Sequence, residues 1–310
     1  MILGIDLGGT KIKLALVNGN EIQASTSIDA HSHKGFTANL ERLTLEINKI
    51  REKNDIMGIG LATPGVVDPE NLKILAINEK YSDLVGFNIK SWAEESFNLP
   101  FVLENDARAA LYGEWQYGIG LNCKNVVGIT LGTGIGSAAV VDGRMLIGNK
   151  FIAGNLGGHM VIDRNGIKCN CGKFGCMEAQ SSTWSLPEII KGHSKYKFSK
   201  LKEANLLDFK NLFTLANEGD ECAREVKEYC LEMWSLGILN LCVAYDPEMV
   251  ILNGGIMASH RDIIPYIEER INRKTKLSPE EKIQVKLAKN IDTAAHFGLK
   301  HLLEISLTKK

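Results

Sequence analysis

The chain has 310 residues, of which 45% are hydrophobic, enough to build the cores of two domains of ordinary size. The net charge of −1 gives no sign of nucleic acid or a membrane surface as a general partner. No long uncharged apolar run is present, and Met1 leads directly into a strand-like segment, so we expect neither a transmembrane helix nor an export signal. The seven cysteines form no regular framework, which favours reduced thiols in the cytoplasm.

The first predicted element is a β-hairpin with a glycine-rich turn. Residues 2–6 and 12–17 are strand-like runs, and the turn between them contains Gly8, Gly9 and Thr10. Backbone amides in such a turn can approach an anion closely, and Asp6 could hold Mg²⁺. Lys11 is a further candidate for reaching a phosphate, although a solvated strand residue is its more ordinary role. An ordinary hairpin whose turn needs glycine explains the same pattern.

A helix and a third strand follow the hairpin. Residues 38–53 have helical periodicity, and residues 56–61 form an apolar strand that runs into a Pro-Gly turn at Gly65. Such a turn places the backbone close to a ligand. Asn78 lies in the loop after the next apolar run.

The last predicted strand of this half ends in two polar residues. Residues 101–103 are followed by Asn105 and Asp106, and then by a helix-like run over residues 107–117. In open α/β sheets, side chains at the carboxyl end of a strand face the ligand cleft. Either residue could instead only cap the helix. Similar strand-end loops recur in this half of the chain, which favours a shared cleft.

The second half repeats the opening pattern. A strand at 126–131 leads through a turn containing Thr133 and Gly134 into a returning strand at 137–141. The repeat predicts two related α/β domains, each presenting a phosphate-binding hairpin to one cleft. The strand at 247–252 ends near Gly254 and Gly255, where a nucleotide could lie against the backbone or the chain could simply turn into a helix.

The segment from Gly154 to Glu178 contains a candidate metal cluster. Its potential ligands are His159, Cys169, Cys171 and Cys176. Four nitrogen and sulfur ligands in a short run can close a tetrahedral site, which favours zinc. Glu178 follows two residues after the last of these cysteines.

Several motifs together resemble those of the ROK family (repressors, open reading frames, kinases), sugar kinases on the actin, hexokinase and heat-shock ATPase fold. They are DLGGTK at 6–11, TPGVVD at 63–68, ENDA at 104–107, LGTGIGSA at 131–138, GGH at 157–159 and CNCGKFGCMEA at 169–179. The resemblance implies an α/β protein with two actin-like ATPase (ribonuclease H-like) domains and a cleft between them. The expected domains are residues 1–117 with the C-terminal helix 294–310, and residues 118–293, which include the zinc-binding loop.

The resemblance also implies a role for each matching residue. Asp106 corresponds to the catalytic base that takes a proton from a sugar hydroxyl. The residues expected to contact the sugar are Gly65, Asn78, Asn105, His159 and Glu178. The residues expected in the phosphate loops are Asp6, Gly8, Gly9, Thr10, Thr133 and Gly134, with Gly254 and Gly255 near the adenosine. The implied ligands are ATP, Mg²⁺ and a structural Zn²⁺ held by His159, Cys169, Cys171 and Cys176. A cytoplasmic homodimer without nucleic-acid or membrane partners is expected.

Two departures from the family pattern bear on the choice of sugar. Most kinases of the family have a sugar-binding Glu three residues before the histidine, where this chain has Leu156. Either that contact is lost, or Asn155 replaces it with a change of register. In addition, Asn78 is followed by Glu79, Lys80 and Tyr81 rather than by Leu-Pro.

The expected function is therefore ATP-dependent phosphorylation of a hexose or an N-acetylhexosamine. A sugar-responsive repressor is the first alternative, but the phosphate hairpin starts at residue 6 and leaves no room for a preceding helix-turn-helix. A non-catalytic sugar-binding protein is the second alternative, suggested by Leu156. The intact Asp106 and the two phosphate hairpins argue against it.

Overall fold

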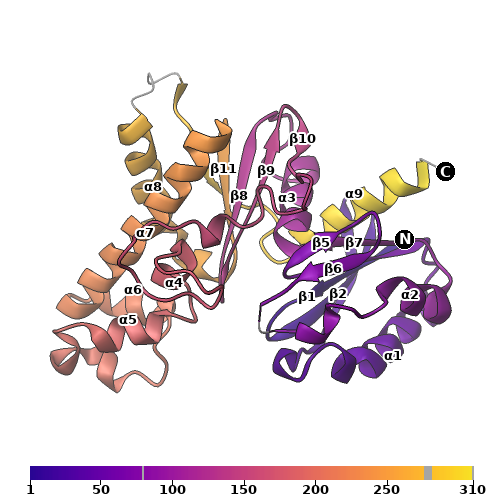
Figure 1. The fold of residues 1–310 in the computed structure, drawn as a ribbon, viewed down its shortest axis with the longest axis horizontal. Helices are drawn as coiled ribbons and strands as arrows, with labels where there is room; N and C mark the ends of the chain where they lie inside the picture. The colour runs from indigo at the N-terminus through magenta and orange to yellow at the C-terminus, as the bar shows by residue number, and fades with distance from the viewer. Residues whose placement is uncertain (79, 276–280, 309–310) are drawn as a thin grey trace. The chain divides into compact units, whose positions relative to one another are not determined.

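The computed structural model describes residues 1–78, 80–275 and 281–308, so Glu79 of the loop after Asn78 lies outside the described residues. The chain forms two compact units, which Figure 1 colours along the sequence. The first unit comprises residues 1–122, 145–155 and 289–310, and the second comprises residues 123–144 and 156–288. The division expected from the sequence assigned residues 118–122, 145–155 and 289–293 to the other domain.

The first unit is built on a five-stranded sheet of order β3-β2-β1-β4-β7. Its strands are β1 (Ile2–Leu7), β2 (Lys11–Asn18), β3 (Glu21–Asp29), β4 (Gly58–Thr63) and β7 (Phe101–Asn105). The first three strands are antiparallel, and β1, β4 and β7 are parallel. A separate two-stranded sheet pairs β5 (Val66–Asp68) with β6 (Lys73–Ala76). The parallel strands therefore bring the end of β1, the turn after β4 and the end of β7 to one edge.

Helices cover both faces of this sheet (Figure 1). On one side lie α1 (Thr37–Lys53) and α2 (Ile89–Phe97), and on the other lie α3 (Asp106–Tyr117) and α9 (Ala294–Thr308). The close packing of α3 on α9 depends on two glycines. A Cβ at Gly113 would lie 1.9 Å from the Ala294 carbonyl oxygen, and one at Gly298 would lie 1.9 Å from the Ala109 carbonyl oxygen. A larger residue at either position would push the helices apart.

The second unit has a five-stranded sheet of order β10-β9-β8-β11-β12. Its strands are β8 (Val126–Leu131), β9 (Ile135–Val141), β10 (Arg144–Met145), β11 (Met249–Asn253) and β12 (Gln284–Leu287). Its helices are α4 (Met177–Ser181), α5 (Leu186–Gly192), α6 (Phe209–Asn217), α7 (Glu221–Tyr245) and α8 (His260–Thr275). The predicted α/β class and the internal repeat are confirmed, because each sheet starts with an antiparallel hairpin whose first strand pairs in parallel with a later strand.

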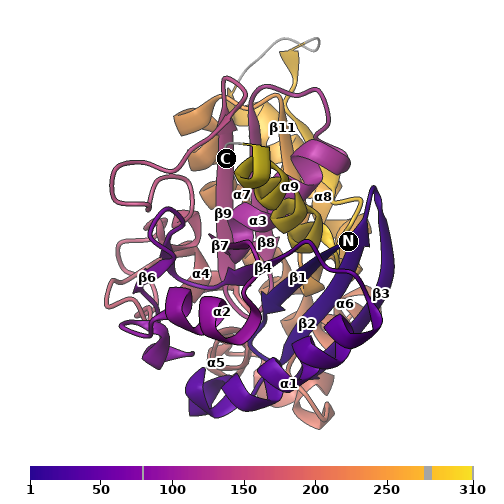
Figure 2. The same cartoon turned by 90° about the vertical axis from the view of Figure 1, so that its right-hand side faces the viewer.

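Strand β3 has no counterpart among the predicted elements. Its residues EIQASTSID are mostly exposed, so the alternation of apolar and polar residues that marks a half-buried strand is absent. Figure 2 shows β3 at the outer edge of its sheet, beside β2. An edge strand without a buried face is held mainly by backbone pairing, which the sequence pattern does not reveal.

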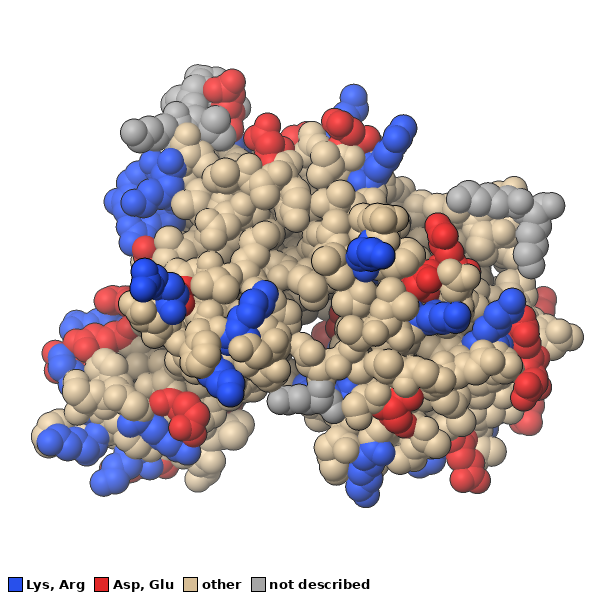
Figure 3. Space-filling model, viewed as in Figure 1, with Lys and Arg blue, Asp and Glu red and all other residues tan. Residues whose placement is uncertain are grey.

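The charge distribution on the surface agrees with the near-zero net charge, and the helices agree with the absence of a long apolar run in the sequence. On the face drawn in Figure 3, side chains of both charges are interspersed over both units. Among the described residues, no helix combines the length and the apolar content needed to cross a bilayer.

Candidate functional site

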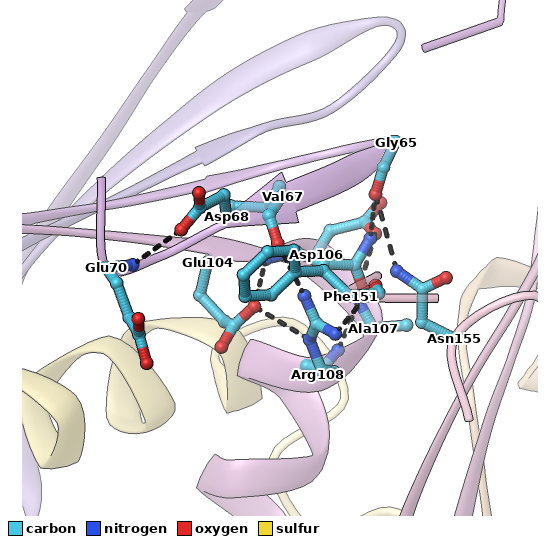
Figure 4. A network of polar contacts seen from close by, with 11 residues as sticks. Gly65, Val67, Asp68, Glu70, Glu104, Asp106, Ala107, Arg108, Phe151 and Asn155 are labelled. Atoms are coloured by element: carbon cyan, nitrogen blue, oxygen red, sulfur yellow. Dashed lines mark hydrogen bonds and ion pairs between the residues drawn. The ribbon is translucent and has the colours of Figure 1, made fainter. Parts of the chain in front are cut away.

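Asp106 lies where β7 passes into α3, and its neighbour Asn105 caps the helix. The Asn105 Oδ1 atom accepts a hydrogen bond from the Arg108 amide at 3.1 Å. The Asn105 Nδ2 atom donates to the Gly65 carbonyl and to Asp106 Oδ1, both at 3.0 Å. Asn105 therefore caps the helix, and its side-chain amide holds Asp106 beside Gly65. Figure 4 shows Asp106 and Gly65 close together.

The carboxyl group of Asp106 has an unusual acidity. Burial raises its pKa to about 7, and the nearby negative charge of Asp6 adds to the increase. Hydrogen bonds from the Ala107 amide and the Asn105 side chain act in the opposite direction. A group with a pKa near neutrality can both take up and release a proton at physiological pH, as a general base must.

Two side chains from distant segments donate hydrogen bonds to the carbonyl groups of the turn between β1 and β2. The Tyr81 hydroxyl donates to the Gly8 carbonyl at 2.9 Å, and the Ser32 hydroxyl donates to the Gly9 carbonyl at 2.7 Å. Tyr81 is fully buried and adopts a left-handed conformation at φ 54°, which is uncommon for a residue with a Cβ. Strained residues persist only where their surroundings hold them, so we interpret Tyr81 as a support for the turn.

Two charged residues flank this turn. Burial raises the pKa of Asp6, while the nearby His296 and Lys13 side chains oppose the rise. A bound cation would keep such a carboxylate ionised, so its chemistry fits the expected Mg²⁺. Lys11 makes an ion pair of 2.6 Å with Asp29 on β3, and both side chains are largely exposed. Thr10, which lies directly before Lys11 in the turn between β1 and β2, is also exposed.

The segment before the metal cluster shows which of its residues faces Gly65. Asn155 is 5% exposed, and its Nδ2 atom donates to the Gly65 carbonyl at 3.5 Å, whereas Leu156 is 38% exposed. The Asn155 Oδ1 atom is buried without a protein hydrogen-bond partner among the described residues. Gly65 itself has φ 96°, and a Cβ there would lie 2.4 Å from the Ala76 carbonyl oxygen. A buried acceptor without a partner is costly unless a ligand or water satisfies it.

Four side chains of the second unit converge as a possible zinc site. The ligand atoms of His159, Cys169, Cys171 and Cys176 all lie within 4.8 Å of one another. The His159 Nδ1 to Cys169 Sγ distance is 3.5 Å, and the Cys171 Sγ to Cys176 Sγ distance is 3.6 Å. Zn–N and Zn–S bonds of normal length give tetrahedral edges of about 3.6 Å for N to S and about 3.8 Å for S to S. The donor atoms and their spacing therefore fit zinc.

The three thiols of the cluster differ in acidity. Burial raises the pKa of Cys169 to about 12 and raises the pKa of Cys176, so without a cation these two thiols stay protonated at neutral pH. Although burial acts in the opposite direction, the pKa of Cys171 is lowered by hydrogen bonds from the Lys173 amide and from the two neighbouring thiols. A divalent ion at the centre would supply the charge that stabilises the thiolates. The loop is tight around this centre: Gly175 has φ 72°, and a Cβ there would lie 1.5 Å from the Asp163 carbonyl oxygen.

Glu178 connects the metal-bearing loop to the second glycine turn. Its Oε2 atom accepts a hydrogen bond from the Ile135 amide at 2.8 Å, and its Oε1 atom accepts one from Trp184 Nε1 at 3.2 Å. A Cβ at Gly134 would lie 2.5 Å from Glu178 Oε2. The carboxylate predicted to bind sugar thus also braces the turn predicted to bind phosphate. Thr133 accepts from the Trp184 amide at 3.3 Å through its carbonyl.

The two glycines predicted to lie near the adenosine differ in the space around them: Gly254 is closely packed, and Gly255 is not. Gly254 follows β11 with φ 99°, and a Cβ there would lie 2.3 Å from the carbonyl oxygen of Leu131 at the end of β8. A Cβ at Gly255 would meet nothing within 4 Å. Gly254 therefore lies next to the strand that leads into the Thr133 turn, in agreement with a nucleotide site.

Within each unit, the structure brings most of the predicted site residues together. In the first unit, Asp106, Asn105 and Gly65 are joined by hydrogen bonds, and the Asp6 charge acts on Asp106. Asn78 lies in an exposed loop after β6. In the second unit, the metal cluster, Glu178 and the Gly134 turn form one connected set.

Three supporting residues were not predicted from the sequence: Ser32, Tyr81 and Arg108. Ser32 and Tyr81 reach the turn from distant segments, so no local pattern indicates them. Arg108 had a usable signal, because a charged residue four positions after Glu104 sits among apolar helix residues and could pair with it.

The fold and these two connected sets define an ATPase-like α/β protein with a buried carboxyl group whose pKa is about 7 and a Cys₃His cluster that could hold a metal ion. Residues 2–305 match the ROK family, and the chain belongs to that family. It is 32% identical over 279 residues to a glucokinase from Halalkalibacterium halodurans, covering 86% of this chain and 84% of the relative. It is 27% identical over 282 residues to a xylose repressor from Bacillus spizizenii, covering 88% of this chain and 68% of the repressor. The structure of a ROK hexokinase from Thermus thermophilus matches with a TM-score of 0.80 at 26% identity, covering 100% of this chain and 99% of that one.

Proposed function

We propose that this chain is an ATP-dependent kinase that phosphorylates a hydroxyl group of a hexose or an N-acetylhexosamine. The observation that carries the proposal is Asp106, a carboxyl group with a pKa of about 7 at the end of β7, held by Asn105 beside Gly65. Such a group can orient a sugar hydroxyl and accept its proton as the phosphoryl group is transferred. Membership of the ROK family and the similarity to a glucokinase support this assignment.

The remaining site residues take supporting roles in this proposal. The two glycine turns, at Gly8 and Gly134, hold the phosphates of ATP, and Asp6 holds Mg²⁺, which supplies charge neutralisation at the phosphates when bound. Gly254 and Gly255 lie against the adenosine. The zinc is structural, because three cysteines and His159 fill its four positions and leave none open for a substrate. Its function is to fix the loop that carries His159 and Glu178, the proposed sugar contacts of the second unit.

The test is an ADP-release assay over a panel of hexoses and N-acetylhexosamines, with the protein loaded with zinc and supplied with Mg²⁺. We expect turnover with at least one sugar, and none when ATP or the sugar is omitted. Calorimetric binding of ATP and sugar without turnover would identify a non-catalytic sugar-binding protein. The same preparation run by light scattering tests the proposed homodimer.

Tyr81→Phe is expected to weaken the binding of ATP. The substitution leaves the Gly8 carbonyl without its buried donor, at a cost of about 0.5–1.5 kcal/mol. We expect the KM for ATP to rise several-fold, by up to about tenfold, while the KM for the sugar stays close to wild type. Steady-state kinetics measures both constants. Tyr196→Phe, in the second unit outside the glycine turns, is the control; equal effects of the two variants would remove Tyr81 from this role.

Asn155 is the residue through which we expect the sugar to be selected on the side of Gly65. Its buried Oδ1 has no protein partner among the described residues, so a sugar hydroxyl that donates to it would complete its hydrogen bonding. Asn155→Ala should raise the sugar KM by about tenfold, the loss of one good hydrogen bond. Asn155→Asp places a second negative charge, in addition to that of Asp6, near Asp106, and this raises the pKa of Asp106 further. The acidic limb of the pH profile of kcat/KM should therefore move above about 7. Leu156→Ala should leave the sugar KM and the pH profile unchanged. If Leu156→Ala changed them and the Asn155 variants did not, the sugar contact would belong to Leu156.

A further inference from the structure

Arg108 is a fully buried cation in the first turn of α3, with 0% of its side chain exposed. Its Nε atom donates to Glu104 Oε1 at 2.8 Å, and the Glu104 side chain is 1% exposed. Both groups lose their water on burial, so a pair of this kind contributes little net stability compared with apolar residues of similar size. A gain in stability therefore does not explain the buried pair of Arg108 and Glu104, which points to another role.

The other end of the guanidinium holds two backbone segments that are distant in sequence. Its Nη1 atom donates to the Phe151 carbonyl at 3.1 Å, and its Nη2 atom donates to the Val67 carbonyl at 3.2 Å. Figure 4 shows Arg108 between these carbonyls and Glu104, with Asp106 two residues earlier on the same helix. A planar fork of five donors suits this task, whereas a lysine ammonium has no fixed geometry.

Each of the two segments carries a proposed substrate contact. Val67 lies two residues after Gly65, and Phe151 lies four residues before Asn155. Phe151 has φ 58°, a left-handed conformation that persists only where neighbouring groups hold it. Asn155 itself is attached to Gly65 by a single hydrogen bond of 3.5 Å. The position of its Oδ1 atom, which has no partner among the residues described, therefore depends on how firmly the segment around Phe151 is anchored.

We propose that Arg108 is a positioning residue that fixes Gly65 and Asn155 relative to Asp106. Glu104 keeps the guanidinium in place and also accepts a hydrogen bond from the Asn105 amide at 2.7 Å. One buried pair thus links the strand end that carries the base to both substrate-side segments. This inference rests on the proposed kinase function only for its kinetic consequences, because the anchoring itself is a property of the free protein.

Two variants separate positioning from stability. Arg108→Lys keeps the positive charge beside Glu104 but cannot donate to both carbonyls in the same fixed geometry. The double variant Glu104→Gln/Arg108→Met removes both charges, so no lone ion stays buried. Arg51→Lys is the matched control, since Arg51 also bridges two carbonyls, those of Ser96 and Phe97, at 3.4 and 2.9 Å.

For both Arg108 variants we expect kcat/KM for the sugar to fall by about 10²-fold, as for a misplacement of about 1 Å. The KM for ATP should stay within about twofold of wild type. The acidic limb of the pH profile of kcat/KM should stay at about 7, because burial and the Asp6 charge, which raise the pKa of Asp106, are unchanged in these variants. Arg51→Lys should match wild type in all three quantities. Wild-type sugar kinetics in Arg108→Lys would overturn the proposal.

Amide hydrogen exchange gives a second readout that needs no activity. Arg108→Lys should exchange faster than wild type over residues 65–68 and 149–155, and Arg51→Lys should not. Unchanged exchange in both segments would overturn the proposal even if the enzyme is active. Absence of kinase activity in the wild-type protein would contradict the proposed function instead, and faster exchange in Arg108→Lys would still support the anchoring.

Discussion

Replacing Asp106 with asparagine is expected to lower kcat by about 10²–10⁴-fold, the usual contribution of a general base. Asparagine preserves the shape and the hydrogen bonds to Asn105 and Ala107 but cannot accept a proton from the substrate hydroxyl. Sugar affinity should change little, because the contacts with the rest of the site are kept. Single-turnover assays and sugar titrations measure the two effects separately.

The control for this substitution is Glu52→Gln, which removes an exposed carboxylate on α1. It should behave as wild type. If Asp106→Asn retained near-wild-type turnover, Asp106 would lose the role of base, and the proton would have to leave through another group or to solvent.

The same substitution should also change how stability depends on pH. The folded protein holds the Asp106 proton up to a pH of about 7, whereas the unfolded chain releases it near the ordinary value of 3.8. Unfolding therefore releases a proton between these two values, so this residue lowers stability as the pH rises through that range. Melting temperatures of the asparagine variant should exceed those of wild type increasingly from pH 4 to about pH 7, and by a constant amount above that pH. Parallel melting curves would show that burial of Asp106 has no such cost.

Removal of the metal is the second change with a large expected effect. Cys176→Ser, or a strong chelator, should abolish the binding of one zinc per chain and destabilise the loop that carries His159 and Glu178. For a unit of this size, each kcal/mol of lost binding free energy lowers the melting temperature by roughly 2–4 °C. Turnover should be lost with the metal and recover when zinc is added back to the chelated wild-type protein.

Elemental analysis and calorimetry check this result. Cys230→Ala is the control, because Cys230 is a fully buried cysteine on α7 outside the cluster, and this variant should keep its zinc. Zinc binding should also release protons, because burial raises the pKa of Cys169 and Cys176. Affinity should therefore fall as the pH falls. A variant lacking Cys176 with full zinc content would exclude this residue as a ligand.

Much of the fold was readable from local sequence patterns. The two glycine turns, the strand that ends in Asn105 and Asp106, and the cysteine spacing each depend on neighbouring residues, so the hairpins, the repeat and the possible metal cluster could be predicted. Strand β3 could not, because an exposed edge strand has no apolar alternation. The backbone pairing that defines it comes from β2, a different segment.

The supporting contacts of the site were harder to predict because they join distant segments. The Tyr81 hydroxyl meets a carbonyl 73 residues earlier in the chain, and Arg108 meets one 43 residues later. The choice between Leu156 and Asn155 likewise depends on which side chain turns toward Gly65, and only the fold supplies that direction. Single-sequence patterns report the chemistry of a residue but not the partner that folding brings to it.

The double attachment of Glu178 limits how this protein can acquire a new substrate. Its two carboxylate oxygens are bonded to the Ile135 amide and to Trp184, so a substitution there would disturb the turn after β8 together with any sugar contact. Asn155 donates one hydrogen bond of 3.5 Å to Gly65, and its Oδ1 atom has no hydrogen-bond partner in the part of the chain that the structure describes. Under the proposed roles, a substitution at Asn155 would alter the sugar contact and leave the Gly134 turn intact, whereas one at Glu178 would alter both.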